Sequence, residues 1–409
     1  MYNKFRFHLL SLVHLPQSKT YTSCAFTQKN RKLAKMLIDL GHEVFFYGSE
    51  GSDVAEYCNS DRLHFIQTHT LRDIRQDYGD GDNRFEIGYD WTGTDYRHDF
   101  NLLPKPATRK FIDACIREIN AVKKPDDFLL MSQGFYFKEI ADKVKLFLTC
   151  EPGVGYRGSY CGFRAFESSY IQNFTYGSEH PRECINGSHY DRVIPNYFDD
   201  ADYTFKTEKQ NYYLFIGRII KRKGIVIAHL ATKAIGGKLI IAGQGGKQEG
   251  NRLWDHTDTE FSIEGDNFEY VGFADNEKRR ELFANARATF TPTEYLECFA
   301  GTHIESMLSG TPVITTDFGV FGGTVINGVN GYRCDTLDDF VWAAQNIDKL
   351  DRVKVRQTAE RYLMKNVMWD YQKWFEDLHD VFESSVDEKV KGFHRLYDPG
   401  RLIREKITW

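Results

Sequence analysis

Residues 217–224 read GRIIKRKG, and they decide how the second half of the chain is interpreted. They follow a short apolar run at residues 212–216, and the pair Lys223-Gly224 opens the next predicted helix, so the pattern is strand, cationic loop, helix. A diphosphate bound there would meet the guanidinium of Arg218, the ammonium of Lys223 and free backbone N–H groups. Basic residues beside a strand are often only solvated, but this ordered arrangement favours a phosphate-binding loop.

A second stretch, ECFAGTHIE at residues 297–305, carries two carboxylates eight residues apart. Glu297 is expected in the loop before a helix and Glu305 within that helix, so one carboxylate would face a sugar and the other would face ribose hydroxyls. The amides of Gly301 and Thr302 would bind phosphate at the helix N-terminus. Two glutamates flanking an apolar helix are common, so the pair is informative only together with the cationic loop.

Short apolar runs alternate with helical or loop-rich segments through this half of the chain. The runs are residues 212–216, 238–242, 268–271, 288–291 and 312–315. Runs this short and apolar suit parallel strands covered on both faces, so residues 198–369 are predicted to form a Rossmann-like domain. Gly243 and Gly245 suggest a dinucleotide fingerprint, but Gln248 stands where its last glycine would be, which argues against NAD.

The first half begins with a strand, a helix and a strand, predicted at residues 7–13, 26–40 and 44–47. This order is typical of a right-handed βαβ unit in a parallel sheet. Residues 1–197 are therefore predicted to form another Rossmann-like domain. Residues 351–384 are predicted to be helical, and the aromatic C-terminal helix, about residues 370–409, is predicted to pack back on this domain.

Residues 68–106 lack clear periodicity, which is more than a simple connection needs. Tyr89, Trp91 and Tyr96 would either stack on the sugar rings of an acceptor or pack on their own domain. The triplet Asp80-Gly81-Asp82 matches a metal-binding pattern, but acidic residues around glycine also make ordinary turns. No metal site is predicted.

Glu151 and Arg157 belong to a loop that follows another predicted strand. Open α/β sheets bind ligands at the carboxyl ends of their strands, so both residues are candidates for the acceptor site. The glycine and proline residues between them would equally serve to shape a turn.

Composition excludes several classes of protein. The chain has 409 residues and a formal charge of −5, which suits two domains and gives no nucleic-acid footprint. Its eight cysteines include no C-x-x-C pair, which argues against a zinc site or a disulfide framework. No run approaches the roughly 18 apolar residues of a membrane helix, so a cytoplasmic location without a membrane span is expected.

Together these residues resemble the retaining GT-B glycosyltransferases of family 4. The resemblance covers most of the second domain and rests on Gly217-Arg218, Lys223-Gly224, the Gly243 loop, residues 271–273 and the E-x7-E segment 297–305. It implies two Rossmann-like domains facing across a cleft, with a nucleotide sugar held by the second and an acceptor by the first. Cations replace the metal in this family, so none is required.

The resemblance also implies roles for single residues. Arg218 and Lys223 would neutralise the diphosphate leaving group, Glu297 would contact the donor sugar, and these three form the catalytic set. Glu305 would bond the ribose. Further donor contacts are expected at Gly217, Gly243, Val271, Phe273, Phe299, Gly301 and Thr302. The nucleotide would leave from the front face through an oxocarbenium-like state, with retention at the anomeric carbon.

The expected donor and acceptor rest only on the resemblance to this glycosyltransferase family. GDP-mannose is favoured over UDP-glucose because mannosyl transfer is frequent there, the acceptor would be a glycan or glycoprotein, and a homodimer is left open. Where the family has a glycine-rich loop, this chain has PQSKT at residues 16–20, and Gln133-Gly134 and Glu151-Pro152 stand where it often has a histidine. These departures resemble divergent enzymes of large DNA viruses, which would act in the host cytoplasm.

Two alternatives to glycosyl transfer remain open. An isomerase such as a nucleotide-sugar 2-epimerase would use the same two-domain architecture and would interconvert donors without an acceptor. A sugar-nucleotide-binding protein without turnover would keep the phosphate loop and lose the acceptor side. The set of Arg218, Lys223, Glu297 and Glu305 favours the transferase.

Overall fold

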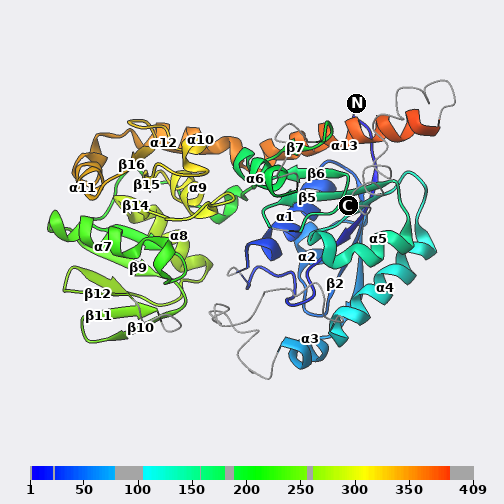
Figure 1. Cartoon of the computed structure of the whole chain (residues 1–409), viewed down its shortest axis with the longest axis horizontal. Helices are drawn as coiled ribbons and strands as arrows, with labels where there is room; N and C mark the ends of the chain where they lie inside the picture. Colours follow the sequence, from blue (N-terminus) through cyan, green and yellow to red (C-terminus); the bar gives the residue numbers. More distant parts are fainter. Residues whose placement is uncertain are drawn as a thin grey trace. The chain divides into compact units, whose positions relative to one another are not determined.

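The computed structural model describes residues 2–21, 24–78, 105–156, 158–179, 188–255 and 261–386. It divides the chain into two compact units (Figure 1). The described part of the first unit runs to Tyr197 and resumes at Met364, and the second unit spans Phe198–Leu363. The helix α13 (Met364–Val386) therefore belongs to the first unit from its first residue, six residues before the predicted 370.

Seven parallel strands form the sheet of the first unit, in the order β3-β2-β1-β4-β5-β6-β7. The strands are β1 (Arg6–Leu10), β2 (Glu43–Ser49), β3 (Leu63–His69), β4 (Phe128–Leu130), β5 (Leu148–Val154), β6 (Phe163–Phe166) and β7 (Arg192–Val193). The predicted βαβ start is confirmed by β1, α1 (Ala25–Asp39) and β2. The strand β5 extends through Pro152 with a register shift, so Glu151 lies within a strand rather than in the predicted loop.

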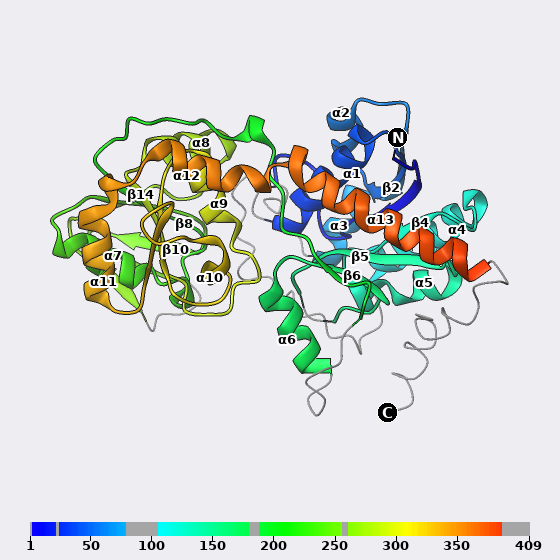
Figure 2. The ribbon, with the colours of Figure 1, turned by 90° about the horizontal axis from the view of Figure 1, so that it is seen from above.

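Helices cover both faces of this sheet. Leu33 and Leu37 of α1 and Tyr371 and Phe375 of α13 pack on one face, and Figure 2 shows α13 running along the unit. The other face is covered by α4 (Pro106–Val122) and α5 (Lys138–Val144). The remaining helices of the unit are α2 (Val54–Cys58), α3 (Leu71–Tyr78) and α6 (Ser169–Glu179).

The second unit has a six-stranded parallel sheet in the order β13-β9-β8-β14-β15-β16. The strands are β8 (Tyr213–Ile216), β9 (Leu239–Ala242), β13 (Phe268–Tyr270), β14 (Ala288–Thr291), β15 (Val313–Thr316) and β16 (Gly331–Cys334). The five predicted strands are confirmed, and β16 was missed. A small antiparallel sheet of β10 (Gly246–Glu249), β11 (Arg252–Asp255) and β12 (Ser262–Glu264) follows β9.

Helices also cover both faces of this second sheet. On one face α8 (Asn276–Asn285) packs Leu282 and Phe283 against Leu214. On the other face the Tyr213 hydroxyl of β8 donates to the Ala344 carbonyl of α11 (Leu337–Asn346), 2.8 Å away. The other helices are α7 (Ile225–Ala234), α9 (Gly301–Leu308), α10 (Phe321–Thr324) and α12 (Arg352–Ala359).

One predicted helix is in fact two. The sequence predicted a single helix over residues 351–384, but α12 ends at Ala359, a 3-10 turn follows at Glu360–Tyr362, and Leu363 is extended. Leu363 pairs there with Phe198 as an isolated parallel bridge, so the first and last residues of the second unit are neighbours.

Sequence composition raised two further points, the state of the cysteines and the presence of membrane-spanning helices. The cysteines within the described ranges are free thiols. None of the helices in those ranges combines the length and the apolarity that crossing a bilayer requires.

Candidate functional site

The cationic loop follows β8 as predicted. A 3-10 turn, η3 (Lys221–Lys223), ends at Gly224, which has a φ of +74°, and α7 begins at the next residue. A Cβ at Gly224 would lie 1.9 Å from the carbonyl oxygen of Pro292. Only glycine permits this approach, which brings the loop against the segment that leads into α9.

Three glycines meet at the carboxyl edge of the second sheet. Gly243, after β9, has a φ of +152°, and a Cβ there would lie 1.7 Å from the carbonyl oxygen of Gly217. Its amide donates to the carbonyl of Gly272, after β13, at 2.7 Å. The loops that carry Gly217, Gly243, Val271 and Phe273 are therefore adjacent, at the edge where open α/β sheets bind ligands.

Lys223 and Glu297, far apart in the sequence, form an ion pair in this unit. The Thr293 hydroxyl donates to the same carboxylate oxygen, Oε1, at 3.3 Å, and Glu297 is 8% exposed. Burial disfavours the charged amine, but the Glu297 carboxylate and the Tyr295 phenol outweigh burial and raise the pKa of Lys223. The pair therefore holds a lysine cation and a carboxylate together at neutral pH.

Two arginines belong to the same loop as Lys223. Arg218 is exposed, and it has no ion-pair partner among the residues that the structure describes. The Arg222 guanidinium lies 4.6 Å from the ring centre of Tyr295, a cation–π contact. The sequence analysis missed Tyr295, because nothing in its spacing showed that its ring would lie beside both Arg222 and Lys223.

The segment that enters α9 is strained at Ala300, a non-glycine residue with a φ of +58°. His303 fixes this turn: its Nδ1 donates to the Ala300 carbonyl at 2.5 Å, and its Nε2 accepts from the Thr324 hydroxyl at 2.8 Å. Burial lowers the pKa of His303 to about 4, so the ring is neutral. Gly301 and Thr302, at the helix N-terminus, stay partly exposed.

Phe299 was expected to contact the donor, but its side chain is not accessible to a ligand. Its side chain is buried, and its ring packs edge-on against Tyr362 with the centroids 5.6 Å apart. Only the backbone of Phe299 is therefore available to a ligand.

Glu305 is only partly exposed to solvent, because two side chains of its own unit contact its carboxylate. It pairs with Arg279 of α8 and accepts a hydrogen bond from the Tyr203 hydroxyl at 3.4 Å. The Arg279 guanidinium turns toward α9, so this arginine of α8 is only partly exposed to solvent.

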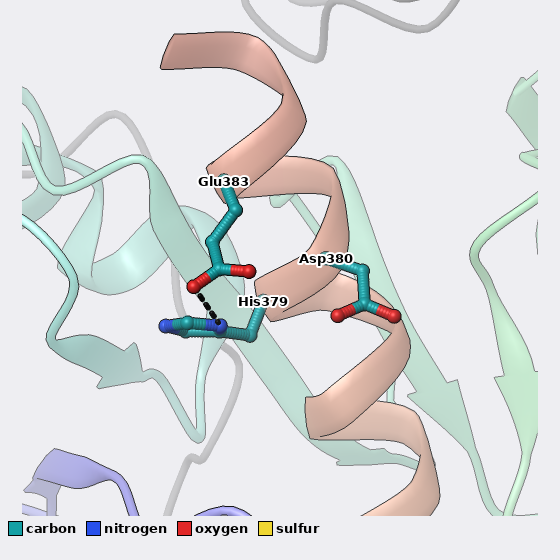
Figure 3. Close-up of side chains that lie close together, drawn as sticks. All are labelled: His379, Asp380 and Glu383. Carbon is teal, nitrogen blue, oxygen red and sulfur yellow. Dashed lines mark ion pairs between the residues drawn. The ribbon is translucent and has the colours of Figure 1, made fainter. Parts of the chain in front are cut away.

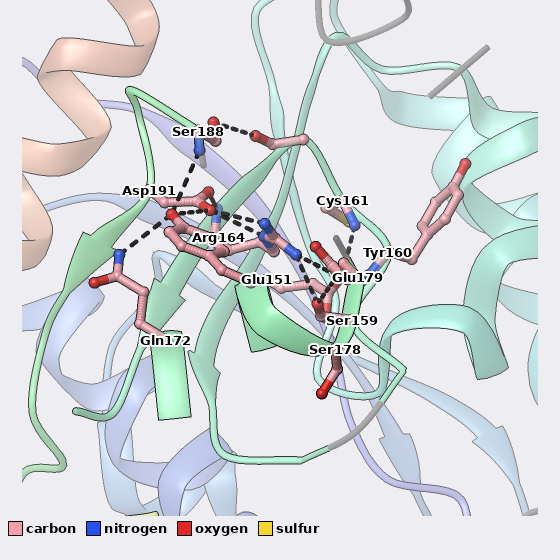
Figure 4. A network of polar contacts seen from close by, with 12 residues as sticks. Glu151, Ser159, Tyr160, Cys161, Arg164, Gln172, Ser178, Glu179, Ser188 and Asp191 are labelled. Carbon is pink, nitrogen blue, oxygen red and sulfur yellow. Dashed lines mark hydrogen bonds and ion pairs between the residues drawn. The ribbon is translucent and has the colours of Figure 1, made fainter. Parts of the chain in front are cut away.

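Glu151 does not serve as predicted. It is fully buried, and its Oε1 accepts from the amides of Tyr160 and Cys161 (Figure 4). Its Oε2 accepts from the Tyr156 hydroxyl at 2.6 Å. Burial raises the pKa of Glu151, although these donors oppose the shift. A carboxylate so enclosed ties the loop after β5 together and is not available to an acceptor. Arg157 and Trp91, the other acceptor candidates, lie outside the described residues.

The neighbouring polar network is also structural. Arg164 of β6 donates to Asp191 through Nε and Nη2, at 3.1 and 2.9 Å, and to Glu179 through Nη1 at 2.7 Å (Figure 4). These bonds satisfy a buried arginine and connect β6 to α6 and to the segment before β7.

One group among the described residues has metal-ligand geometry, His379, Asp380 and Glu383 on α13 (Figure 3). His379 Nδ1 lies 3.7 Å from Glu383, and both carboxylates are exposed. Acidic groups at helix spacing on a surface are common, so this cluster gives no metal site. Asp80 and Asp82 lie outside the described residues.

Two Rossmann-like parallel sheets in one chain define the GT-B fold, and the protein has this fold. Two solved structures share it over almost their full length. Sucrose-phosphate synthase from Thermosynechococcus elongatus is 16% identical, with a TM-score of 0.61 over 92% of this chain and 99% of that chain. A glycosyltransferase involved in avilamycin A biosynthesis is 18% identical, with a TM-score of 0.59 over 92% and 98%.

The sequence matches to known proteins cover only part of the chain. Residues 199–361 match the family model described as glycosyl transferases group 1, and these residues make up nearly all of the second unit. Glycogen synthase of Mycobacterium tuberculosis is 29% identical over 188 residues, which are 44% of this chain and 44% of the relative. The chain thus spans less than half the length of that relative.

Proposed function

We propose that the protein is a retaining glycosyltransferase that moves a hexose from a nucleoside diphosphate sugar to a hydroxyl acceptor. The Lys223–Glu297 ion pair carries this proposal. A cation and a carboxylate from separate loops meet where a parallel sheet binds ligands, and they do so within residues 199–361, which match the glycosyl transferases group 1 model.

The chemistry asks the protein to stabilise a departing diphosphate. Arg218 and Lys223 supply positive charge there, and the amides of Gly301 and Thr302 add the dipole of a helix N-terminus. Because Glu297 and burial already hold Lys223 in place, its charge needs little reorganisation when the bond to the sugar breaks. Glu297 is then the acidic group nearest to the sugar end of the donor.

Donor preference and metal independence belong to the same proposal. The cations Arg218 and Lys223 take the place that a divalent metal would hold against a diphosphate. GDP-mannose stays the leading donor on family frequency, but none of the three relatives described above names mannose. UDP- and ADP-sugars are therefore tested with equal weight.

The test is a product analysis. The protein is incubated with GDP-, UDP- and ADP-hexoses and an oligosaccharide acceptor mixture, once with EDTA and once with Mn²⁺, and products are followed by ¹H NMR. We expect one nucleoside diphosphate to be released equally in both conditions, with the anomeric configuration of the donor retained. Epimerised donor without released nucleotide would identify an isomerase instead. Activity only with Mn²⁺ would contradict metal independence, and an inverted product would contradict retention.

A further inference from the structure

Glu305 is contacted on both carboxylate oxygens by residues of its own unit. Arg279 Nη2 pairs with Oε2, and the Tyr203 hydroxyl donates to Oε1 at 3.4 Å. The side chains of Arg279 and Glu305 are 24% and 18% exposed, so the ion pair is only partly accessible to water.

The helix α8 places both contacts. It begins after Asp275, whose side chain accepts from the Lys278 amide, and this cap sets the helix so that Arg279 faces α9. The next residue, Arg280, donates to the carbonyls of Ala201 at 2.7 Å and Asp202 at 3.1 Å. Those carbonyls belong to the turn directly before Tyr203. One helix therefore carries the first partner of Glu305 and holds the segment that carries the second.

We propose that Arg279 and Tyr203 are positioning residues that aim the Glu305 carboxylate at the ribose of the donor, an inference that rests on the proposed function. An ionised carboxylate has about four lone-pair sites, so two contacts leave room for the two ribose hydroxyls. A carboxylate already fixed before the donor arrives loses less side-chain entropy on binding. Arg279 and Tyr203 thus act on donor affinity through Glu305, without touching the reacting atoms.

A purely structural role is the competing explanation. Arg279 also lies over the ring of Phe283, with 5.5 Å from the guanidinium carbon to the ring centre, so its loss would loosen the packing of α8. That effect would weaken every nucleotide equally. A positioning role predicts instead that the benefit of the ribose hydroxyls shrinks, and this difference is measurable.

The experiment is a calorimetric cycle. UDP, GDP and ADP, each with its 2′-deoxy and 3′-deoxy analogues, are titrated into the wild type, Arg279→Met, Arg279→Lys, Tyr203→Phe and Glu305→Gln. Lys278→Met is the control, because Lys278 is exposed on the same helix and pairs only with Glu281 among the described residues. We expect the wild type to lose about tenfold in affinity without a hydroxyl, and Arg279→Met to lose less than about threefold. Arg279→Lys should recover part of the difference, Tyr203→Phe should lie between, and Lys278→Met should match the wild type.

Each outcome decides a different claim. If Arg279→Met weakens ribose and deoxyribose nucleotides by the same factor, the positioning role is wrong and the proposed function stands. If the wild type does not distinguish the deoxy analogues, Glu305 does not bind ribose and the inference fails with that role. If the wild type binds none of the nucleotides, the proposed function fails as well. Tyr203→Phe preserves the ring and provides the same comparison should Arg279→Met not fold.

Discussion

The Glu297 carboxylate accepts hydrogen bonds from neighbouring side chains. The Lys223 ammonium and the Thr293 hydroxyl both donate to Oε1, and the Tyr295 hydroxyl is a further hydrogen-bond partner of this carboxylate. The Glu297 carboxylate thereby balances the charge of the Lys223 ammonium until a diphosphate binds. The carboxylate therefore matters less for holding the donor than for the charge that surrounds the sugar as its bond breaks.

The first prediction concerns Glu297→Gln, which keeps the shape of the side chain and removes its charge. Donor affinity should stay within about threefold of the wild type or become tighter, because Lys223 is released toward the phosphates, whereas turnover should fall by about 100-fold or more. Calorimetry gives the affinity and initial rates give kcat. A variant with unchanged kcat would remove Glu297 from the catalytic set.

The second prediction concerns pH and His303. Its pKa is about 4 in the folded protein against about 6.5 when unfolded, so only the unfolded chain takes up a proton between these values. The stability that the neutral ring provides is complete above about pH 6.5 and is lost as pH falls toward 4, by about 3 kcal/mol. Urea denaturation of the wild type and of His303→Gln should show a flatter pH dependence in the variant. Parallel pH profiles would contradict the assignment.

Residue spacing predicted part of this site and could not predict the rest. The strand–loop–helix order placed Lys223, and the E-x7-E spacing placed Glu297 before α9, because both follow from local chain direction. The contacts of Arg279 and His303 depend on how side chains of separate elements meet, which spacing does not specify. Glu151 shows the same limit, since neither its place within β5 nor its burial could be read from the spacing.

At the scale of elements, strands buried on both faces were the predictable ones. The strands β8 and β9 are continuous apolar runs, whereas β3 reads LHFIQTH and lies at the sheet edge with partial burial. The strand β6 was hidden by Arg164, whose charge is buried only because Asp191 and Glu179 lie beside it. The division between α12 and α13 was missed because the sequence stays helix-compatible through the break.

The third prediction tests how α13 is held. Trp374 is 1% exposed, and its indole N–H donates to the Tyr190 carbonyl at 2.9 Å. Trp374→Ala should therefore lower the free energy of unfolding of the first unit by about 3–5 kcal/mol. Trp369→Ala on the same helix is the control, because Trp369 is 48% exposed and should cost about 1 kcal/mol or less. Equal losses in urea denaturation would contradict the packing described for α13.

At the scale of the whole molecule, the two units differ in how the chain builds them. The second unit, Phe198–Leu363, is continuous in the described chain and contains its own six-stranded sheet. The first unit needs α13, which returns after the second unit is complete and contributes Tyr371, Trp374 and Leu378 to its core. The nucleotide chemistry proposed here lies entirely within the continuous unit.

The fourth prediction follows from this difference. A fragment of residues 198–363 should fold alone and unfold cooperatively, whereas a fragment of residues 1–197 should not, because the apolar surface that α13 covers would be exposed to water. Adding residues 364–386 through a short glycine–serine linker should restore folding of the first fragment. Circular dichroism melting curves distinguish these outcomes. A cooperative transition for residues 1–197 alone would contradict the role given to α13.

The central claim is that Lys223 binds the diphosphate of a nucleotide sugar, and calorimetry with EDTA present tests it most directly. GDP-, UDP- and ADP-sugars are titrated into the wild type, Lys223→Ala and the control Lys221→Ala, which removes an exposed lysine from the same turn. We predict saturable binding of one donor by the wild type and the control, and a loss of about 1.5–3 kcal/mol in Lys223→Ala. Equal donor affinity in Lys223→Ala and the wild type would contradict the account.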